Sequence, residues 1–249
     1  MNKNETSLTT LCASLCEVMG VQPPACAEAS HKPLTDYANE VFNGEKADRI
    51  FMYNPDAIAE WIYRKYPHLL KEATARTDIE VPFCTVMPSV TPVCFGTMYT
   101  GAFPEVHGIM AYEKPVIRID TLFDAMIRAG KKCAIVSTER DSMSKIFLER
   151  EMDYYIYATV EEVNAKAAEL ITEDKYDFLA VYNTNYDAVM HKCGPESLEA
   201  LSELRRNSGD FAMFNVLIQN CWKKHNTLMG FAMDHGCHDT DSGAGTHGL

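Results

Sequence analysis

Short apolar runs that are typical of strands alternate with longer stretches of helical periodicity along most of this 249-residue chain. This alternation predicts a mainly parallel sheet, because parallel strands are joined by crossover connections that are usually helices. We therefore predict an α/β fold with three layers, α/β/α. The strongest predicted strands are residues 49–53, 132–137, 177–182 and 227–233, with weaker ones at 81–83 and 154–157. The predicted helices are residues 120–129, 160–172 and 197–225.

The N-terminal part of the chain is expected to be helical. Residues 1–45 form this helical preface, and Pro23 and Pro24 divide it into two helices because proline lacks the N–H that a helix interior requires. We find no internal repeat, low-complexity tract or interdomain linker, and 249 residues suit one large α/β domain. We therefore expect residues 1–249 to form a single domain.

The charge of the chain limits its partners. The formal net charge is −12 at pH 7, whereas binding to a nucleic-acid polymer or an anionic membrane requires clustered Lys and Arg. An acidic protein can still bind a small phosphate ester when bound cations reverse the local field. No apolar run approaches the ~20 residues that cross a bilayer, so we expect no membrane span.

The cysteines are interpreted as reduced thiols. Nine of them are scattered through the predicted helices and strands. The polar N-terminus contains no convincing secretory signal, so we expect a cytoplasmic protein with small thiol side chains in its core. Cys12 and Cys16 lie one helical turn apart and are followed by Cys26, which leaves a zinc knot as the alternative to packing on a helix face.

Side chains that can bind metals follow three of the predicted strands. Asp56 and Asp187 each come shortly after a strand, and the last apolar run ends at Asp234 and His235. Because the carboxyl ends of parallel strands share one edge of the sheet, we expect these side chains to converge. Aspartate and histidine are zinc ligands, so the sequence predicts a metal site at this edge.

Two further histidines are candidate ligands. His191 comes four residues after Asp187, so on a helix both side chains face the same way. His247 lies close to the C-terminal end of the sequence. Without a metal, the Asp187 and His191 pair would be a surface contact, Asp234 a helix N-cap and His247 a hydrogen-bonded structural histidine.

A threonine at a predicted helix start is the candidate nucleophile. Pro92 suits the first position of a helix, with Thr91 as its N-cap. At that place the backbone N–H groups and the helix dipole favour a phosphate group. A neighbouring metal would stabilise the alkoxide of Thr91 and make it nucleophilic, whereas without a metal Thr91 is only a cap.

In the order and type of these residues the chain resembles the alkaline phosphatase superfamily, and within it the type I phosphodiesterase and nucleotide pyrophosphatase family. Four stretches carry the resemblance: residues 50–56, 87–109, 187–195 and 234–248. It implies an alkaline phosphatase-like core with two divalent metal ions, for which zinc is favoured and manganese or iron also fits the ligands. One ion would be held by Asp187, His191 and His247, and the other by Asp56, Asp234, His235 and Thr91.

The resemblance also implies a mechanism. Thr91 would attack phosphorus in line and form a phospho-threonine, which a water activated at the Asp187 site would release; Ser89 is a minor alternative nucleophile. The N–H groups that follow Thr91 would hold a non-bridging oxygen. Relatives usually carry an asparagine near position 94 as a phosphate contact, so Cys94 is the substrate-binding candidate here.

Two departures from the family concern the boundaries of the site. The interval between Gly108 and Asp187 is short, so we expect a core without a large cap domain and an open active site. The chain ends two residues after His247, where relatives continue into another strand. We therefore allow for a truncated C-terminus, with His238 as a reserve ligand.

These inferences lead to the hypothesis of a zinc-dependent phosphodiesterase or nucleotide pyrophosphatase that acts on a small phosphate ester, with nucleotides among the candidates. The alternatives are a phosphomonoesterase or phosphonate hydrolase of the same superfamily, or a catalytically weak protein that binds a phosphorylated ligand. The helix at 197–225 offers a surface for a homodimer. The aromatic candidates for stacking a base are Phe95, Tyr99, Tyr112 and Tyr186.

Overall fold

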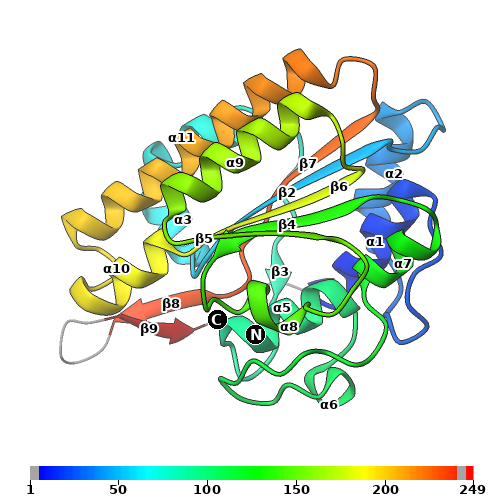
Figure 1. The fold of residues 1–249 in the computed structure, drawn as a ribbon. Coiled ribbons are helices and arrows are strands. Elements are labelled where there is room, and N and C mark those ends of the chain that lie inside the picture. The colour runs from blue at the N-terminus through cyan, green and yellow to red at the C-terminus, as the bar shows by residue number, and fades with distance from the viewer. Residues whose placement is uncertain (1–5, 240–244, 249) are drawn as a thin grey trace.

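The computed structural model describes residues 6–239 and 245–248 (Figure 1). Its central sheet has five parallel strands in the order β5-β4-β6-β2-β7. These strands are β2 (Arg49–Pro55), β4 (Cys133–Thr138), β5 (Asp153–Tyr157), β6 (Phe178–Asn183) and β7 (Thr227–Phe231). The four strong strand predictions, the weaker one at 154–157 and the parallel arrangement are confirmed.

Two short ladders lie outside the central sheet. The predicted strand at 81–83 corresponds to β3 (Phe83–Cys84), which pairs in parallel with β1 (Thr6–Ser7). The preceding Pro82 has no N–H to donate to a ladder, which limits the length of this strand. Beyond β7, the strands β8 (Gly236–Asp239) and β9 (Gly245–Gly248) form an antiparallel pair.

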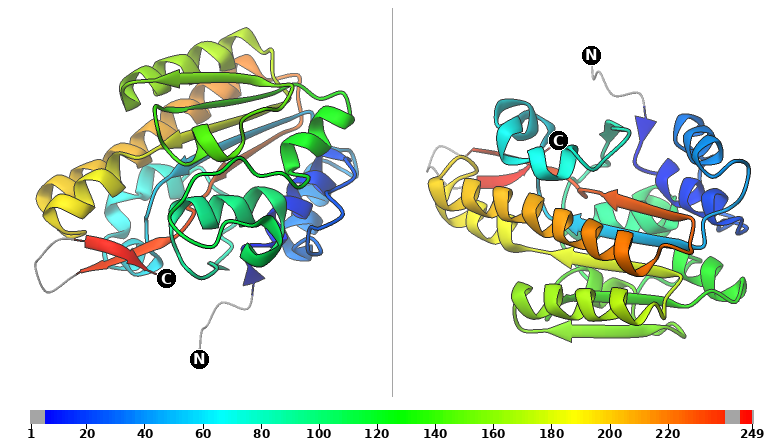
Figure 2. Two further views of the ribbon diagram at one scale, coloured as in Figure 1. Left: turned by 60° about the horizontal axis from the view of Figure 1, so that its bottom comes forward. Right: turned by 90° about the horizontal axis from the view of Figure 1, so that it is seen from above.

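Helices cover both faces of the sheet, as Figures 1 and 2 show. One face is covered by α4 (Lys71–Thr74), α9 (Val160–Glu173) and α11 (Leu198–Cys221). The other is covered by α1 (Thr10–Met19), α2 (Lys32–Val41), α5 (Thr91–Thr100), α7 (Leu122–Arg128) and α8 (Met143–Ile146). The predicted three-layer α/β/α architecture is therefore confirmed.

Strand alternation divides the core between the two faces. In β2, Phe51 and Tyr53 pack under α9 and α11, while Ile50 and Met52 pack on the side of α1 and α5. Asn54 continues the second series, and its side chain accepts a hydrogen bond from the hydroxyl of a tyrosine on α5. The side chain two residues after Asn54, just beyond the end of β2, is therefore also expected on the α5 side of the sheet.

The remaining elements are short. They are α3 (Glu60–Lys65), the 3₁₀ turn η1 (Pro67–Leu69), α6 (Pro104–His107) and α10 (Asn185–Cys193). The interval between Gly108 and Asp187 is described throughout and builds α7, β4, α8, β5, α9 and β6. These residues belong to the three layers, in agreement with the predicted core without a large cap domain.

The helix α11 is 24 residues long, which is long enough to cross a bilayer. It carries charged side chains along its length, among them Glu203, Arg206 and Asp210. In residues 6–239 and 245–248, no helix combines the length and the apolar character of a membrane span.

All nine cysteines lie in the described part of the chain, and none forms a disulfide. Cys12 and Cys16 are fully buried on α1, and the thiol of Cys26 lies 3.7 Å from the carbonyl oxygen of Asp120. Within the described residues these three cysteines do not form a group of metal ligands. The structure therefore supports packing on a helix face rather than a zinc knot.

His107 joins α6 to α5 from a buried position. The Ile109 N–H donates to its Nδ1 at 3.3 Å, so its Nε2 carries the hydrogen and donates to Thr97 Oγ1 at 3.1 Å. Burial lowers the pKa of His107 from 6.5 to about 4. Protonation would place a hydrogen on Nδ1 and therefore break the contact with the Ile109 N–H.

We expect the free energy of unfolding to fall as the pH is lowered from 6.5 to about 4, because in that range the unfolded chain binds a proton that the folded chain excludes. The contribution of His107 to the free energy of unfolding is fully present above the pKa of the unfolded state. The difference between the two pKa values corresponds to about 3 kcal/mol. In His107→Gln the amide can make both hydrogen bonds without titrating, so this part of the pH dependence should disappear. Denaturant unfolding across this pH range measures the effect, and equal slopes for the two proteins would contradict it.

Candidate metal centre

The carboxyl ends of β2, β6 and β7 lie side by side at one edge of the sheet. In the parallel register, Pro55 of β2 is opposite Asn183 of β6, and Tyr53 is opposite Phe231 of β7. Six of the predicted ligands gather beyond these strand ends in two groups, and within each group the ligand atoms lie within 4.8 Å of one another. The groups are Asp56, Asp234 and His235, and Asp187, His191 and His247.

The first group is buried, and one oxygen of each of its carboxylates is held by the protein. Asp56 and Asp234 are each 2% exposed. The hydroxyl of Tyr182 donates to Asp56 Oδ2, and the backbone N–H of Ala57 donates to Asp234 Oδ1 at 3.3 Å. The other two oxygens, Asp56 Oδ1 and Asp234 Oδ2, have no hydrogen-bond partner among the described residues. One oxygen of each carboxylate is thus available for a ligand.

His235 faces the two available oxygens. Its Nδ1 lies 2.9 Å from the carbonyl oxygen of Gly236, an acceptor, so Nδ1 carries the hydrogen and Nε2 presents a lone pair. This Nε2 is 3.4 Å from Asp56 Oδ1 and 3.3 Å from Asp234 Oδ2. Three buried acceptors therefore face one another, and a cation is the kind of group that stabilises such an arrangement.

The carboxylates of this group resist ionisation. Burial, followed by the charge of Asp234, holds the pKa of Asp56 well above its usual range. Burial also raises the pKa of Asp234. Two negative charges without water or a counter-charge are unfavourable, and a divalent cation bound between them would remove that cost.

Thr91 lies next to the buried group. It is 3% exposed, and its hydroxyl is 3.1 Å from His235 Nε2, to which it donates. The expectation that Thr91 is the N-cap of its helix was wrong: α5 begins at Thr91, Val90 occupies the N-cap, and no side chain caps the helix. The reason is that the Thr91 hydroxyl bonds across the sheet edge to His235 instead of to its own helix.

The backbone at the start of α5 differs from the expected phosphate cradle. Pro92 has no N–H, and the N–H groups of Val93 and Cys94 both donate to the carbonyl oxygen of Val90 at 3.0 Å. These N–H groups are therefore engaged within the helix and are not available to a non-bridging phosphate oxygen.

The second group joins α10 to β9. Asp187 and His191 project from successive turns of α10, as their spacing predicts, and His247 comes from β9. The Nε2 atoms of the two histidines are 2.9 Å apart, and each lies 3.2 Å from Asp187 Oδ1. His191 Nδ1 is 3.0 Å from the carbonyl oxygen of Gly245 and donates to it, so Nε2 donates to Asp187 when the ring is protonated and presents a lone pair, suited to a cation, when the ring is neutral.

Asp187 is electrostatically unlike the carboxylates of the first group. Burial by itself would raise its pKa, but hydrogen bonds from His191 and His247 hold the pKa of Asp187 well below its usual range. The same hydrogen bond raises the pKa of His191. Asp187 is therefore a carboxylate that remains charged.

A glycine allows the strand that carries His247 to approach α10. A Cβ atom at Gly245 would lie only 2.0 Å from the sulfur of Met190. The absence of a side chain brings the Gly245 carbonyl within reach of His191. His238, the reserve ligand, is exposed on β8 and belongs to neither group.

The two groups are adjacent but differ in exposure. The ring centroids of His235 and His247 are 4.3 Å apart. The side chains of Asp234 and His235 are 0% exposed, whereas that of His191 is 39% exposed. The site therefore has a sealed side and a side open to solvent.

The donor set fits a pair of divalent cations. Imidazole nitrogens and carboxylate oxygens suit zinc, and also manganese or iron. The observation that supports the fit is the pair of buried oxygens, Asp56 Oδ1 and Asp234 Oδ2, that no described donor satisfies. Buried polar atoms without partners are rare in folded proteins and require an explanation.

The residues proposed to contact substrate have different positions. Cys94 is fully buried, its thiol lies 3.1 Å from Thr85 Oγ1, and burial raises its pKa. Substrate contact by Cys94 stays a prediction. Phe95, Tyr99 and Tyr186 are also fully buried, so they were wrong candidates for stacking a base. Tyr112 is 62% exposed, and its ring centroid is 6.3 Å from that of His247.

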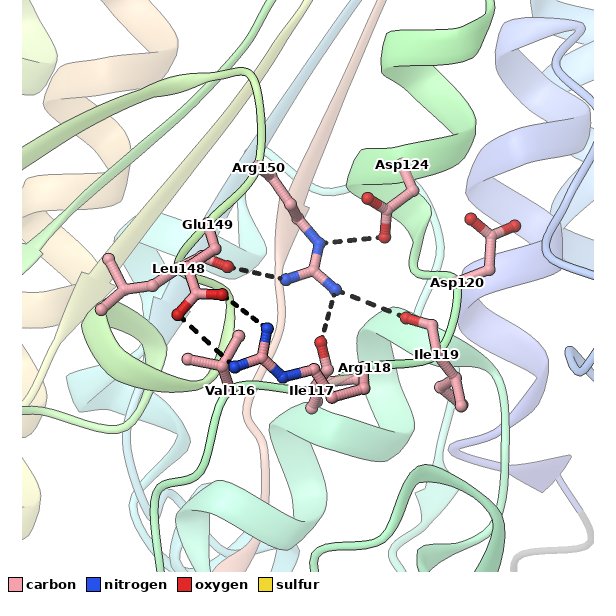
Figure 3. Close-up of a pocket in the computed structure, with 9 residues that line it drawn as sticks. All are labelled: Val116, Ile117, Arg118, Ile119, Asp120, Asp124, Leu148, Glu149 and Arg150. Carbon is pink, nitrogen blue, oxygen red and sulfur yellow. Dashed lines mark hydrogen bonds and ion pairs between the residues drawn. The ribbon is translucent and has the colours of Figure 1, made fainter.

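A separate cavity of about 280 Å³ lies beside α7 (Figure 3). The guanidinium of Arg150 is in its wall, and the side chain of Arg150 is 7% exposed. It donates to Asp124 at 2.9 Å and to the carbonyl oxygens of Leu148 and Ile117 at 3.1 and 3.0 Å (Figure 3). Because the guanidinium N–H groups of Arg150 already donate to the protein itself, we interpret this arginine as a structural residue that links two loops to α7.

The sequence-based reasoning missed two residues that orient the ligands. Tyr182 is a hydroxyl-bearing residue near the carboxyl end of an otherwise apolar strand, and this could have indicated a polar partner at the sheet edge. Ala57 adopts a positive φ of 62°, which turns its N–H toward Asp234. No signal in the sequence indicates this conformation, because alanine rarely adopts it.

Comparisons with known proteins identify the fold. No family model matches the sequence, and no curated protein sequence matches it. The structure is similar to murine ectonucleotide pyrophosphatase/phosphodiesterase 5, with a TM-score of 0.65, 18% identity, and coverage of 78% of this chain and 59% of that chain. An inactive variant of the murine protein in complex with AMP gives a TM-score of 0.61 at 17% identity, with coverage of 78% and 59%.

A bacterial protein has the same architecture. Phosphonoacetate hydrolase from Sinorhizobium meliloti 1021, in complex with phosphonoformate, matches with a TM-score of 0.59 and 18% identity, over 81% of this chain and 61% of that chain. The chain thus spans about three fifths of the length of these proteins. The resemblance inferred from the motifs is confirmed at the level of the fold: the chain has an alkaline phosphatase-like core.

Proposed function

We propose that this chain is a metal-dependent hydrolase of phosphate esters, specifically a phosphodiesterase or nucleotide pyrophosphatase with Thr91 as nucleophile. The observation that carries the proposal is the position of the Thr91 hydroxyl, 3.1 Å from His235 Nε2, beside two buried carboxylate oxygens that lack partners. A nucleophile, a histidine and unneutralised carboxylates are together the components of a metal-assisted phosphoryl-transfer site.

The two groups would hold two divalent ions, with zinc favoured. Asp56, Asp234 and His235 would bind one in the sealed part of the site, and Asp187, His191 and His247 the other in the open part. When bound, such ions act as Lewis acids and lower the pKa of coordinated oxygens, so that nucleophile and leaving group need no separate acid or base.

The residues of the chain define the course of the reaction. Thr91 presents its oxygen from the rigid first turn of α5, which favours a bond to phosphorus while the bond to the leaving-group oxygen breaks. Water then cleaves the resulting phospho-threonine and restores the hydroxyl. This water would enter beside His191, the most exposed ligand of the open group.

The substrate is proposed to be a small phosphoryl compound. The similar proteins were solved with AMP and with phosphonoformate, which are small and anionic. In this chain the exposed ring of Tyr112 lies beside His247, where it is placed to contact a planar part of a substrate such as a nucleobase. Phosphonate hydrolysis is the second candidate because of the similarity to phosphonoacetate hydrolase.

The proposal is tested by measuring metal content together with hydrolysis of an aryl phosphodiester and its matching monoester. We expect about two ions per chain, faster turnover of the diester, and loss of turnover on chelation that zinc restores. Turnover that survives complete metal removal would contradict the mechanism. Metal binding without turnover would support instead a phosphoryl-ligand-binding protein, for which the replacement of the family asparagine by Cys94 is the motivating observation.

A further inference from the structure

The hydroxyl of Tyr182 makes the contact that orients Asp56. Tyr182 is 2% exposed, and its hydroxyl donates to Asp56 Oδ2. The second oxygen of the same carboxylate, Oδ1, is unpartnered and lies 3.4 Å from His235 Nε2. The hydrogen bond therefore leaves Oδ1 as the oxygen that faces the other ligands.

Tyr182 is held rigidly by the central sheet. It lies on β6 directly opposite Asn54 of β2, which places its side chain on the same face as that of Asp56. Its ring packs edge-on against Phe95 of α5, with ring centroids 4.8 Å apart and an interplanar angle of 82°. The hydroxyl can thus fix the carboxylate without being free to turn away.

We propose that Tyr182 is a positioning residue for metal binding: it restrains Asp56 to bind the buried ion through Oδ1 alone. This inference rests on the proposed function, since it presupposes an ion at the buried group. A hydrogen bond to a ligating carboxylate fixes its rotamer and occupies the oxygen that would otherwise compete as a second ligand atom. The Ala57 N–H does the same for Asp234, so both carboxylates point one oxygen at the same place.

The test is metal titration of the metal-free protein in three forms: wild type, Tyr182→Phe and the control Tyr99→Phe. Tyr99 is an equally buried tyrosine whose hydroxyl donates to Asn54 at 2.8 Å, and Asn54 is not a metal ligand. In Tyr182→Phe we expect one of the two zinc ions to bind about 10- to 100-fold more weakly. In Tyr99→Phe we expect both ions to bind as in wild type. Both variants lose a buried hydrogen bond, so the folding stability of each should be lower than that of wild type.

A spectroscopic measurement separates positioning from a general structural effect. The absorption spectrum of the cobalt-loaded protein depends on the geometry of the ligands. We expect this spectrum to change in Tyr182→Phe, because Asp56 can then bind through either or both oxygens, and to be unchanged in Tyr99→Phe. Replacing Tyr182 with 4-aminophenylalanine keeps the ring and a donor, so affinity should return toward that of wild type.

The outcomes distinguish this inference from the proposed function. Wild-type affinity and spectrum in Tyr182→Phe would overturn the role of Tyr182 while leaving the proposed function intact. A folded 4-aminophenylalanine variant that binds the weakened ion at least 10-fold less tightly than wild type would also overturn it, and because this comparison is with wild type it decides the matter if Tyr182→Phe does not fold. A wild-type protein that binds no ion would refute both the proposed function and the inference built on it.

Discussion

Thr91→Ala is expected to lower phosphodiester turnover by at least about 10³-fold while leaving the metal content unchanged, since removal of a catalytic nucleophile is among the most damaging changes in hydrolases. The methyl group of alanine keeps the first turn of α5 but removes the oxygen that would bond to phosphorus. All six other ligand side chains remain in place. Turnover and metal analysis on the same purified samples measure the two effects separately.

Two variants control for indirect effects of this substitution. Thr91→Ser retains a hydroxyl and should keep measurable turnover. Thr97→Ala removes another buried hydroxyl of α5, one that contacts His107, and should lower stability without abolishing the reaction. Full activity of Thr91→Ala would refute the assignment of the nucleophile. Equal losses in Thr91→Ala and Thr97→Ala would instead point to disruption of α5.

The sheet was predictable because its three central strands, β4, β6 and β2, are short and buried on both faces. Residues 178–181 are completely buried in β6, and a run of this kind between two amphipathic helices has few alternatives to a central parallel strand. The convergence of Asp56, Asp187 and Asp234 followed from the same reasoning, because parallel strands end on one edge. Topology alone thus brought together residues that are far apart in sequence.

The orientation of individual groups was less predictable. The Thr91-Pro92 pair is typical of an N-cap, yet Thr91 is the first helical residue because its hydroxyl bonds to His235 from a distant part of the chain. Sequence propensity describes local competition for hydrogen bonds and does not include such a partner. Tyr182 acts on the site through a hydrogen bond from its side chain, and Ala57 acts through its positive φ. Both features exist only once the strands are assembled.

The second large effect is expected from Asp234→Asn, which should make the metal-free protein more stable while preventing metal binding at the buried group. The pKa of Asp234 is raised by burial, so the stability that its neutral form contributes is present at low pH and lost as pH rises through the folded-state pKa. At neutral pH the charged form is therefore a cost. The amide of asparagine has no charge, can still accept from the Ala57 N–H, and can donate toward Asp56 Oδ1.

The expected gain in the free energy of unfolding of the metal-free protein is about 1–3 kcal/mol, the usual penalty of a buried polar group without a partner. Asp187→Asn is the matched control and should have the opposite sign. The pKa of Asp187 is lowered because hydrogen bonds from His191 and His247 outweigh burial, so its charged form contributes stability at neutral pH that is lost as pH falls through the lowered folded-state pKa.

Denaturant unfolding with chelator and with excess zinc measures both parts of this prediction. Each bound zinc ion should stabilise wild type by about 2.7 kcal/mol when the zinc concentration is a hundred times the Kd of its site, and Asp234→Asn should lose the increment of the buried ion while keeping that of the ion at Asp187. A lower stability of metal-free Asp234→Asn than of metal-free wild type would contradict the prediction. It would mean that the carboxylate of Asp234 is satisfied in the folded protein without an ion, and the structural argument for a metal at the buried group would then lose its strongest support.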